Sequence, residues 1–230
     1  MSLILNIDTS TETANACIAE DGKVMTSISN PHQKDHAAFL HHAINDIIKK
    51  NSLKLGSLSA IAVTNGPGSY TGLRVGMASA KGLCYALNKP LITIGSLEVM
   101  ANAVIEATGP QNEPALYCPL IDARRMEVYT ALYDSQMKEM ATPKALILNE
   151  NSFEEILSNQ KVYFFGSGAA KFETVLSNKN AFFLPMERSM VSMSKLSFSQ
   201  FLERKFTDLV DSEPFYIKDF HSSPDFSNKK

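Results

Sequence analysis

Four short segments of this sequence combine residues that could hold a phosphate or a metal ion. The first is Asp8-Thr9-Ser10, directly after an apolar run at the N-terminus. A carboxylate beside hydroxyl groups can hold Mg²⁺ and a nucleotide, because Mg²⁺ prefers oxygen ligands. No glycine follows until Gly22. The same residues therefore fit equally well a turn that only satisfies its own hydrogen bonds.

The second segment is Gly66-Pro67-Gly68. A Walker-type phosphate loop needs a Lys-Ser/Thr pair at a fixed distance after its first glycine, and this sequence has none there, so such a loop is excluded.

On the helix expected over residues 71–87, Gly72, Gly76 and Ala80 recur every four residues. Such a flat ridge allows close packing, either against a partner helix or against the chain's own sheet. The sequence leaves both interpretations open.

The third and fourth segments could contact an anion. Arg124 and Arg125 are two consecutive basic residues. Together they could bind an anion or a partner carboxylate, or they could simply be solvated surface charges. Gly166-Ser167-Gly168 follows an expected strand and opens an expected helix, where backbone amides can receive an anion, although such a turn needs glycine for geometry alone. The candidate nucleotide or anion contacts are Asp8, Ser10, Arg124, Gly166 and Gly168.

No catalytic residue and no metal site are predicted. Four of the five histidines lie near the first helix, but they lack an H-E-x-x-H arrangement, and Pro31 interrupts the helix before them. No G-x-S-x-G elbow appears, and Cys84, in the middle of an apolar helix, is expected to be a packed core residue. The four histidines are His32, His36, His41 and His42.

These segments are positioned by alternating strands and helices. The expected order is three strands, then helix, strand, helix, strand and helix, with a Gly/Pro linker at 108–114 before a shortened repetition of the same pattern. Strands are expected at 3–7, 14–19, 24–28, 59–64, 90–94, 116–121, 127–133, 145–148, 162–165 and 182–183. Helices are expected at 35–50 with Asp35 as its cap, 71–87, 96–107 with Ser96 as its cap, 153–157, 169–176 and 194–206.

The composition narrows the class of protein. The 230 residues carry a net charge of −2 with 44% hydrophobic residues, which is typical of a globular protein and argues against a chain that binds nucleic acid by itself. The N-terminal apolar run is too short to cross a membrane or form a signal core. Cys17, Cys84 and Cys118 lie far apart with no ligand spacing, which favours a reducing cytoplasm.

Four motifs together resemble the TsaB (YeaZ) family of the actin-like ATPase superfamily. They are Asp8-Thr9-Ser10, the run from Gly66 to Gly76 (GPGSYTGLRVG), the segment Asp122 to Tyr129 (DARRMEVY) and the segment Pro214 to Lys218 (PFYIK). The resemblance implies two actin-like (ribonuclease H-like) α/β lobes, each a mixed sheet flanked by helices. The expected divisions are residues 1–107, a smaller lobe over 115–214 whose final helix packs back, and a polar tail at 219–230.

The resemblance also implies a function. A TsaB-like chain is a non-catalytic partner of TsaD, acting with TsaE in threonylcarbamoyl transfer to adenosine 37 of tRNA, and contacting tRNA only through the complex. It is expected to form a homodimer when alone. No cofactor of its own is expected, and ATP or ADP would bind only at an interface shared with a partner. TsaD's metal-binding histidines are replaced here by Ser96 and Met100. The expected partner-interface residues are His36, Leu40, Ile44, Gly72, Gly76, Met77 and Lys81.

A small ATP-dependent phosphotransferase of the sugar-kinase type is the alternative function. Actin-like enzymes hold ATP with two acidic, Gly-rich hairpins, and the second of these should carry Asp-x-Gly. This chain has Asp122-Ala123-Arg124 there, whose side chains would crowd a phosphate. The sequence therefore favours a binding subunit over a kinase.

Overall fold

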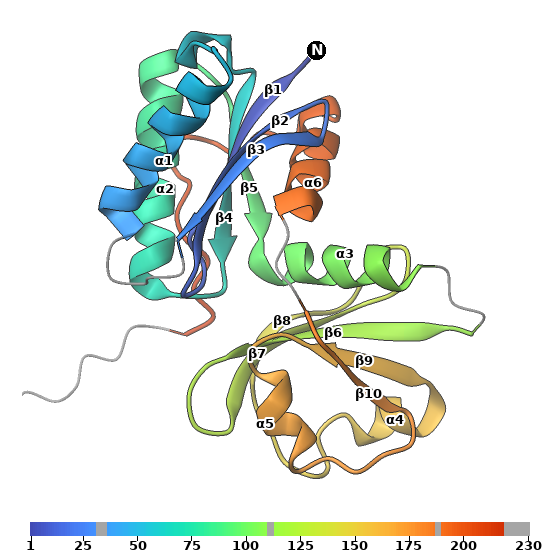
Figure 1. The fold of residues 1–230 in the computed structure, drawn as a ribbon. Helices are drawn as coiled ribbons and strands as arrows, with labels where there is room; N and C mark the ends of the chain where they lie inside the picture. The colour runs from blue at the N-terminus through green and yellow to red at the C-terminus, as the bar shows by residue number, and fades with distance from the viewer. Residues whose placement is uncertain (31–35, 110–112, 187–189, 219–230) are drawn as a thin grey trace, which may run out of the picture.

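The computed structural model describes residues 1–30, 36–109, 113–186 and 190–218, which form two lobes, each built on a five-stranded sheet (Figure 1). The strand orders are β3-β2-β1-β4-β5 and β10-β9-β6-β7-β8. In each lobe three consecutive strands pair antiparallel, and the next two join in parallel beside the first. The second lobe thus repeats the topology of the first, and the arrangement is that of two actin-like lobes.

The first lobe follows the predicted order of elements. Its strands alternate with long amphipathic helices, and Ser69 caps α2 by accepting a hydrogen bond from the amide of Gly72. The Asp35 cap and His32 lie outside the described residues. The elements are β1 (Leu3–Asp8), β2 (Ala14–Glu20), β3 (Lys23–Asn30), α1 (His36–Lys50), η2 (Leu55–Ser57), β4 (Ala60–Gly66), α2 (Tyr70–Leu87), β5 (Leu91–Gly95) and α3 (Ser96–Thr108).

The second lobe has the same strands but much shorter crossover helices. Its edge strand β8 is largely exposed and begins at Glu139, six residues before the predicted strand. The final helix covers Met190–Leu202 instead of the predicted 194–206, and it ends before Arg204, which takes a left-handed φ of 55°. The elements are β6 (Ala115–Asp122), β7 (Glu127–Tyr133), β8 (Glu139–Ile147), α4 (Glu154–Asn159), β9 (Lys161–Phe165), α5 (Ala169–Glu173), β10 (Ala181–Leu184) and α6 (Met190–Leu202).

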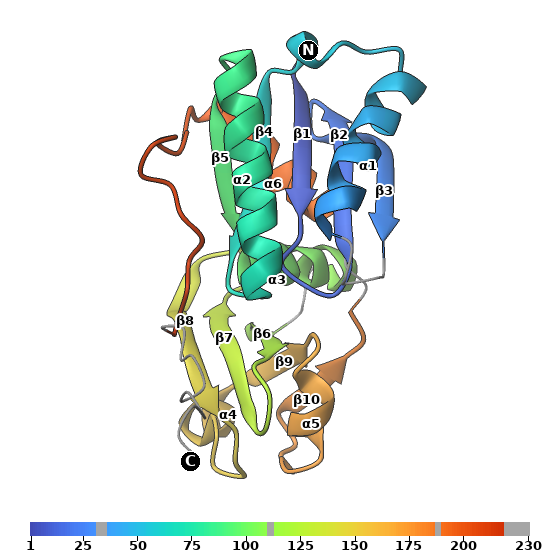
Figure 2. The ribbon, with the colours of Figure 1, turned by 90° about the vertical axis from the view of Figure 1, so that its left-hand side faces the viewer.

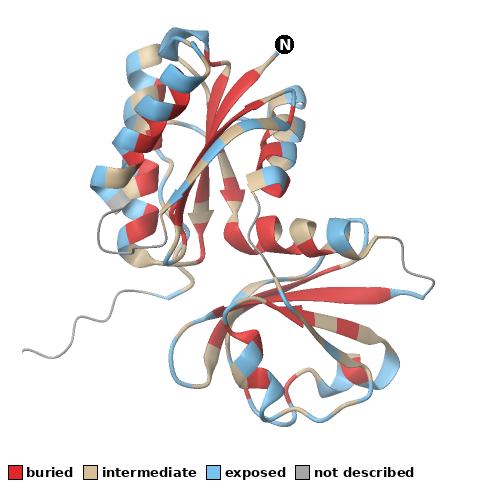
Figure 3. Cartoon of the chain, viewed as in Figure 1, coloured by how far each residue is buried: buried red, intermediate tan, exposed pale blue. Residues whose placement is uncertain are grey.

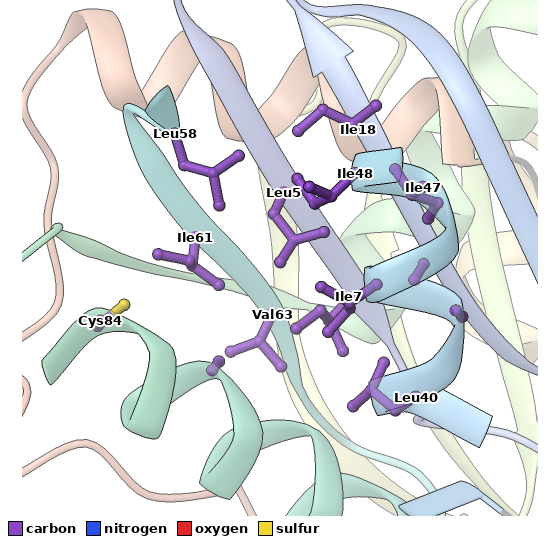
Figure 4. Close-up of a cluster of buried hydrophobic side chains, with 14 of the residues drawn as sticks. Leu5, Ile7, Ile18, Leu40, Ile47, Ile48, Leu58, Ile61, Val63 and Cys84 are labelled. Atoms are coloured by element: carbon purple, nitrogen blue, oxygen red, sulfur yellow. The ribbon is translucent and has the colours of Figure 1, made fainter. Parts of the chain in front are cut away.

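Helices α1 and α2 lie side by side on one face of the first sheet (Figure 1). Their inward side chains, among them Leu40, Ile47 and Cys84, point at Ile7 and Ile61 of the sheet (Figure 4). Burial is concentrated on the strands and on the inner faces of these helices, while the outer faces are exposed (Figure 3). This apolar layer holds the first lobe together, since each buried aliphatic side chain contributes roughly 1.5–3 kcal/mol.

The last helix of each lobe packs on the other lobe's sheet. Helix α3 places Leu97, Met100 and Val104 against Tyr117 and Phe165 of the second sheet. Helix α6 returns to the first lobe, where its Met193 packs with Ile4 and Ile92. This exchange joins the two lobes through apolar contacts on both sides.

A C-terminal strap, residues 207–218, adds a third connection between the lobes (Figure 2). It pairs with the edge of β5 at Leu91, donates the amide of Phe215 to the carbonyl oxygen of Asn65 at 2.7 Å, and ends in an ion pair between Lys218 and Glu127 of β7. The predicted polar tail at 219–230 lies outside the described residues. None of the described helices has both the length and the hydropathy needed to cross a membrane.

Candidate functional site

The turn after β1 is used for packing inside the first lobe. One carboxylate oxygen of Asp8 accepts hydrogen bonds from the amide and hydroxyl of Ser10, at 3.0 and 2.6 Å, and from the hydroxyl of Thr64 at 2.9 Å. Asp8 and Ser10 are both buried. These groups satisfy one another, as the turn interpretation expects.

The start of α2 covers this turn. The hydroxyl of Thr9 donates to the carbonyl oxygen of Gly72 at 2.7 Å, and the amide of Ser69 donates to the carbonyl oxygen of Ser10 at 2.7 Å. A Cβ atom at Gly72 or Gly76 would overlap Thr9 itself, and one at Gly68 would overlap Ser10. The glycines of this segment therefore pack α2 directly against the turn after β1.

The residues predicted for a partner interface have roles inside the lobe. Leu40, Ile44 and Met77 are buried in the core beneath α1 and α2. The ammonium group of Lys81 donates to the carbonyl oxygens of Val210 and Ser212 in the strap, at 3.2 and 2.8 Å. Gly72 and Gly76 pack on the turn after β1, and the side chain of His36 lies outside the described residues. An interface formed by this set stays a prediction.

The outer face of α2 presents a different set of residues. Ala78, Gly82 and Ala86 are exposed and spaced four apart, and Tyr85 beside them has 83% of its surface exposed. A Cβ at Gly82 would meet nothing within 4 Å, in contrast to Gly76 one and a half turns earlier. This stripe allows another helix to approach α2 closely, with an aromatic side chain available to bury.

The β6–β7 turn holds two arginines in an uncommon backbone conformation. Arg124 and Arg125 have φ values of 71° and 47°, and the left-handed region costs roughly 1–2 kcal/mol per non-glycine residue. Asp122 stabilises the turn, because its carboxylate accepts a hydrogen bond from the amide of Arg124 at 2.6 Å. Lys171 donates to Asp122 and to the carbonyl oxygens of Arg125 and Glu127, at 2.7, 2.9 and 2.6 Å.

The charges at this turn are mostly paired. Partial burial raises the pKa of Asp122, but the Lys171 ammonium and the Arg124 amide more than offset it, so that the pKa lies below its ordinary value. Glu127 receives both carboxylate bonds from Lys218, at 2.6 Å each. The exposed guanidinium of Arg124 has no hydrogen bond or ion pair within the described parts of the chain.

Gly166 and Gly168 are explained by packing on β6. Gly166 has a φ of 102°, and a Cβ there would lie 2.6 Å from the carbonyl oxygen of Leu120. The amide of Gly168 donates to that same oxygen at 2.9 Å, and a Cβ at Gly168 would lie 2.6 Å from the Val128 side chain. The helix that follows has only five residues. Of the predicted anion contacts, only Arg124 thus lies at an open surface.

Arg124 faces a hollow between the two lobes. One part, of about 360 Å³, is lined by the Gly-Pro-Gly turn and Tyr70 of the first lobe, the β6–β7 turn with Tyr129, and the end of the strap. A second pocket, of about 590 Å³, shares Arg124 with the first and is lined by the second lobe and Lys218 of the strap, with Arg125, Met126 and Ile147 among its residues. Tyr70 packs against Tyr216 of the strap with the rings tilted by 36° and 4.9 Å between their centroids, and the guanidinium of Arg74 lies 4.0 Å from the centroid of the Tyr70 ring.

The start of α3 corrects one sequence prediction. Gly95, not Ser96, is the N-cap of this helix, and the buried hydroxyl of Ser96 has no hydrogen-bond partner in the described structure. Glu98 accepts a hydrogen bond from the Gly95 amide instead, as the third residue of a capping box does. Burial raises the pKa of the Glu98 carboxyl above its ordinary value, with neighbouring Glu139 adding to the shift.

The described residues contain no group of three or more His, Cys, Asp or Glu side chains placed to hold a metal ion. All three cysteines are buried, and burial raises the pKa of Cys17 and Cys84 to about 11 and that of Cys118 to about 12. Thiols with such pKa values are poor nucleophiles near neutral pH, because the thiolate is the reactive form.

The model of the family described as TsaD: tRNA N6-adenosine threonylcarbamoyltransferase matches residues 24–221. The chain belongs to this family. A Haemophilus influenzae protein named tRNA threonylcarbamoyladenosine biosynthesis protein TsaB is 27% identical over 94% of this chain and 93% of the relative. The Bacillus subtilis protein of the same name is 35% identical, over 56% of this chain and about half of its own length, 54%.

A solved structure has the same fold. A Pseudomonas aeruginosa protein, described as uncharacterized with similarity to the peptidase YEAZ, superposes with a TM-score of 0.81 at 22% identity, over 95% of this chain and 100% of that one. Within the family, the chain is a member of the TsaB (YeaZ) group. In its GPGSYTGLRVG motif, the close approach to Thr9 and Ser10 explains Gly68, Gly72 and Gly76. Gly66 has a φ of 123°, and a Cβ there would lie 2.6 Å from the carbonyl oxygen of Phe215.

Several residues that shape the site were not found from the sequence. The β6–β7 turn is bound by Lys171 through Asp122 and by Lys218 through Glu127, and Tyr70 is contacted by Tyr216. All three contacts come from segments that are distant along the chain. The neighbouring sequence of a single lysine on a short helix does not indicate that its side chain binds a distant turn. The Pro214–Lys218 motif was noticed only as a family marker, although it is the part of the strap that reaches the second lobe.

Proposed function

We propose that this chain is the non-catalytic partner of TsaD in threonylcarbamoyl transfer to adenosine 37 of tRNA. Its TsaB relatives are named for tRNA threonylcarbamoyladenosine biosynthesis, and they support a role in that pathway. The burial of Asp8, of Ser10 and of the three cysteines supports a role without chemistry of its own. The same features argue against the sugar-kinase alternative, because a bound nucleotide needs room beside the first hairpin.

The outer face of α1 and α2 is the surface proposed to meet TsaD. The observation that carries this proposal is the exposed Tyr85 beside the small residues Ala78 and Gly82 on α2. Burying an aromatic ring on a flat stripe combines a large apolar contact with close helix packing. In the absence of TsaD, a second copy of this chain occupies the same face, and TsaE joins the TsaD complex. Any ATP or ADP is held at that shared interface.

Complex formation tests the surface directly. The chain is mixed with its cognate TsaD, and the mass of the complex is measured by gel filtration with light scattering. Gly82→Arg places a long charged side chain on the outer stripe, where the fold has room for it. Gln136→Arg adds the same charge to the exposed β7–β8 turn of the other lobe.

The expected result is a complex with the wild type and with Gln136→Arg, and none with Gly82→Arg at micromolar concentration. A complex that survives Gly82→Arg would show that α2 is not the contact surface. Absence of a complex with the wild type would remove the partner role itself. Gly76→Arg is unsuitable for this test, because its side chain would overlap Thr9 inside the lobe.

A further inference from the structure

Arg74 lies on the outer face of α2, in line with two small residues of that face. Arg74, Ala78 and Gly82 are all exposed and are spaced four residues apart, so they lie on one side of the helix. This face of α2 is turned toward the viewer in Figure 2, with the strap running beside the helix. A partner helix packed along the small residues therefore also passes Arg74.

Two tyrosines hold the guanidinium of Arg74 in place. Its Nε–H group donates a hydrogen bond to the hydroxyl of Tyr216 at 3.0 Å, and its Cζ atom lies 4.0 Å from the centroid of the Tyr70 ring. The two tyrosine rings pack against each other in turn. An arginine that is already fixed loses less conformational freedom when it binds a partner, and this favours binding.

The positive charge of Arg74 is not neutralised by the chain itself. No carboxylate in the described ranges forms an ion pair with it, and the phenol of Tyr216 is uncharged. The other cation of α2, Lys81, binds two carbonyl oxygens of the strap and acts on the charge of Asp208. Arg74 thus remains a cation at this face for which a partner can supply the opposite charge.

We propose that the partner helix packed on this face carries an aspartate or glutamate that binds Arg74. This inference rests on the proposed function, because it specifies the chemistry of the partner at the surface assigned to TsaD. A guanidinium binds a carboxylate through two parallel N–H···O bonds, and its two terminal nitrogens provide such a pair of donors while Nε stays bonded to Tyr216. The charge pair fixes the register of the partner helix along α2.

The charge pattern favours a different chain over a second copy. Helix α2 contains Arg74 and Lys81 and no acidic residue, so two copies that pack α2 against α2 bring no carboxylate to the contact. Self-association through the small residues and Tyr85 therefore does not use Arg74. Binding of TsaD should depend on Arg74, and homodimer formation should not.

Titration calorimetry of the full chain with its cognate TsaD tests this pair. Arg74→Met removes the guanidinium at an exposed position, and Arg74→Lys keeps the charge but not the paired donors. Arg204→Met is the matched control, because it removes the same charge from an exposed arginine after α6, which packs on the opposite face of the first sheet. Melting temperatures of the variants confirm that each is folded.

Tyr216 is a positioning residue in this proposal. Tyr216→Phe keeps the ring and removes the hydroxyl that accepts from Nε of Arg74. The substitution should weaken TsaD binding by about threefold in the wild-type background and have no effect in Arg74→Met. An equal loss in both backgrounds would contradict the role of Tyr216 in holding Arg74.

The expected result is at least about tenfold weaker binding of TsaD by Arg74→Met, as loss of a charged pair predicts, with Arg204→Met within about twofold of the wild type and Arg74→Lys between them. Added salt should weaken binding by the wild type more than binding by Arg74→Met, because salt screens the pair. Equal binding by the wild type and Arg74→Met would overturn this inference and leave the proposed function intact. A homodimer weakened as strongly as the TsaD complex would overturn the preference for a different chain, and no binding of TsaD by the wild type would overturn the proposed function itself.

Discussion

The hydroxyl of Thr9, at the end of β1, donates a 2.7 Å hydrogen bond to the carbonyl oxygen of Gly72 in the first turn of α2. This bond joins residues that are 63 positions apart and holds the first turn of α2 against the turn after β1. The glycine ridge of α2 is what permits it, since a side chain at Gly72 or Gly76 would overlap Thr9. The motif that invites a phosphate-loop interpretation therefore serves the packing of the first lobe.

Gly76→Ala should lower the free energy of unfolding by about 1–3 kcal/mol, because the added methyl group must displace the Thr9 side chain. Gly82→Ala, on the open face of the same helix, should raise it by up to about 1 kcal/mol, because alanine favours the helix. Urea denaturation of both variants measures the difference. Equal effects of the two substitutions would contradict the assigned packing.

Lys171→Met should lower the free energy of unfolding by about 1–3 kcal/mol, since it removes three hydrogen bonds to the β6–β7 turn. Asp122 and the carbonyl oxygen of Glu127 keep one backbone donor each, and the carbonyl oxygen of Arg125 loses its donor. Lys161→Met removes an ion pair with Glu113 at 2.6 Å, in which both side chains are largely solvated, and should cost less than about 0.5 kcal/mol. Denaturant titration distinguishes the two variants. A larger loss at Lys161 would refute the role given to Lys171.

Glu98→Gln should stabilise the protein at neutral pH. The folded-state pKa of Glu98 is raised by burial, so the folded chain holds this proton more tightly than the unfolded chain, and ionisation above the ordinary pKa of about 4.3 weakens the fold. The advantage of the variant should thus shrink as the pH falls toward 4, where the wild-type carboxyl is neutral. Thermal unfolding between pH 4 and 8 measures the stability difference between Glu98→Gln and the wild type, and Glu150→Gln, at an exposed position, is the control. A stability difference that does not change with pH would contradict the raised pKa of Glu98.

The three cysteines should be inert in the folded protein. Burial and pKa values of about 11 to 12 keep Cys17, Cys84 and Cys118 protonated and out of contact with reagent. A thiol-exchange reagent at pH 8 should label none of them in native buffer and all three in denaturant. Rapid labelling of any thiol in native buffer would show that the assigned core opens.

The strands and long helices were predictable because they depend on local patterns. The apolar runs of β1, β4 and β6 and the helical periodicity of α1 all appear within short windows of sequence. Strand β8 was predicted only in part. It is an exposed edge strand that contains Pro143, and an edge tolerates a residue that cannot donate to the sheet.

The site was less predictable, because its contacts join distant segments. The sequence allowed the ridge of Gly72 and Gly76 to face either a partner or the chain's own sheet, and only the position of Thr9 shows which surface it meets here. The cap of α3 was assigned to Ser96 by residue type, whereas Glu98 supplies the bond to the Gly95 amide. Arg124 was identified from its motif, but its left-handed backbone and its place in the hollow required the folded chain.

The central claim, that this chain supports TsaD without chemistry of its own, is tested most directly by threonylcarbamoyl transfer to tRNA. The cognate TsaD and TsaE are supplied with tRNA and the carbamoyl-adenylate precursor, and modified adenosine is measured without this chain, with wild type, and with Gly82→Arg or Gln136→Arg. Modification is expected with wild type and Gln136→Arg only, and no product is expected from this chain without TsaD. Full modification in the absence of this chain, or product formed by this chain alone, would contradict it.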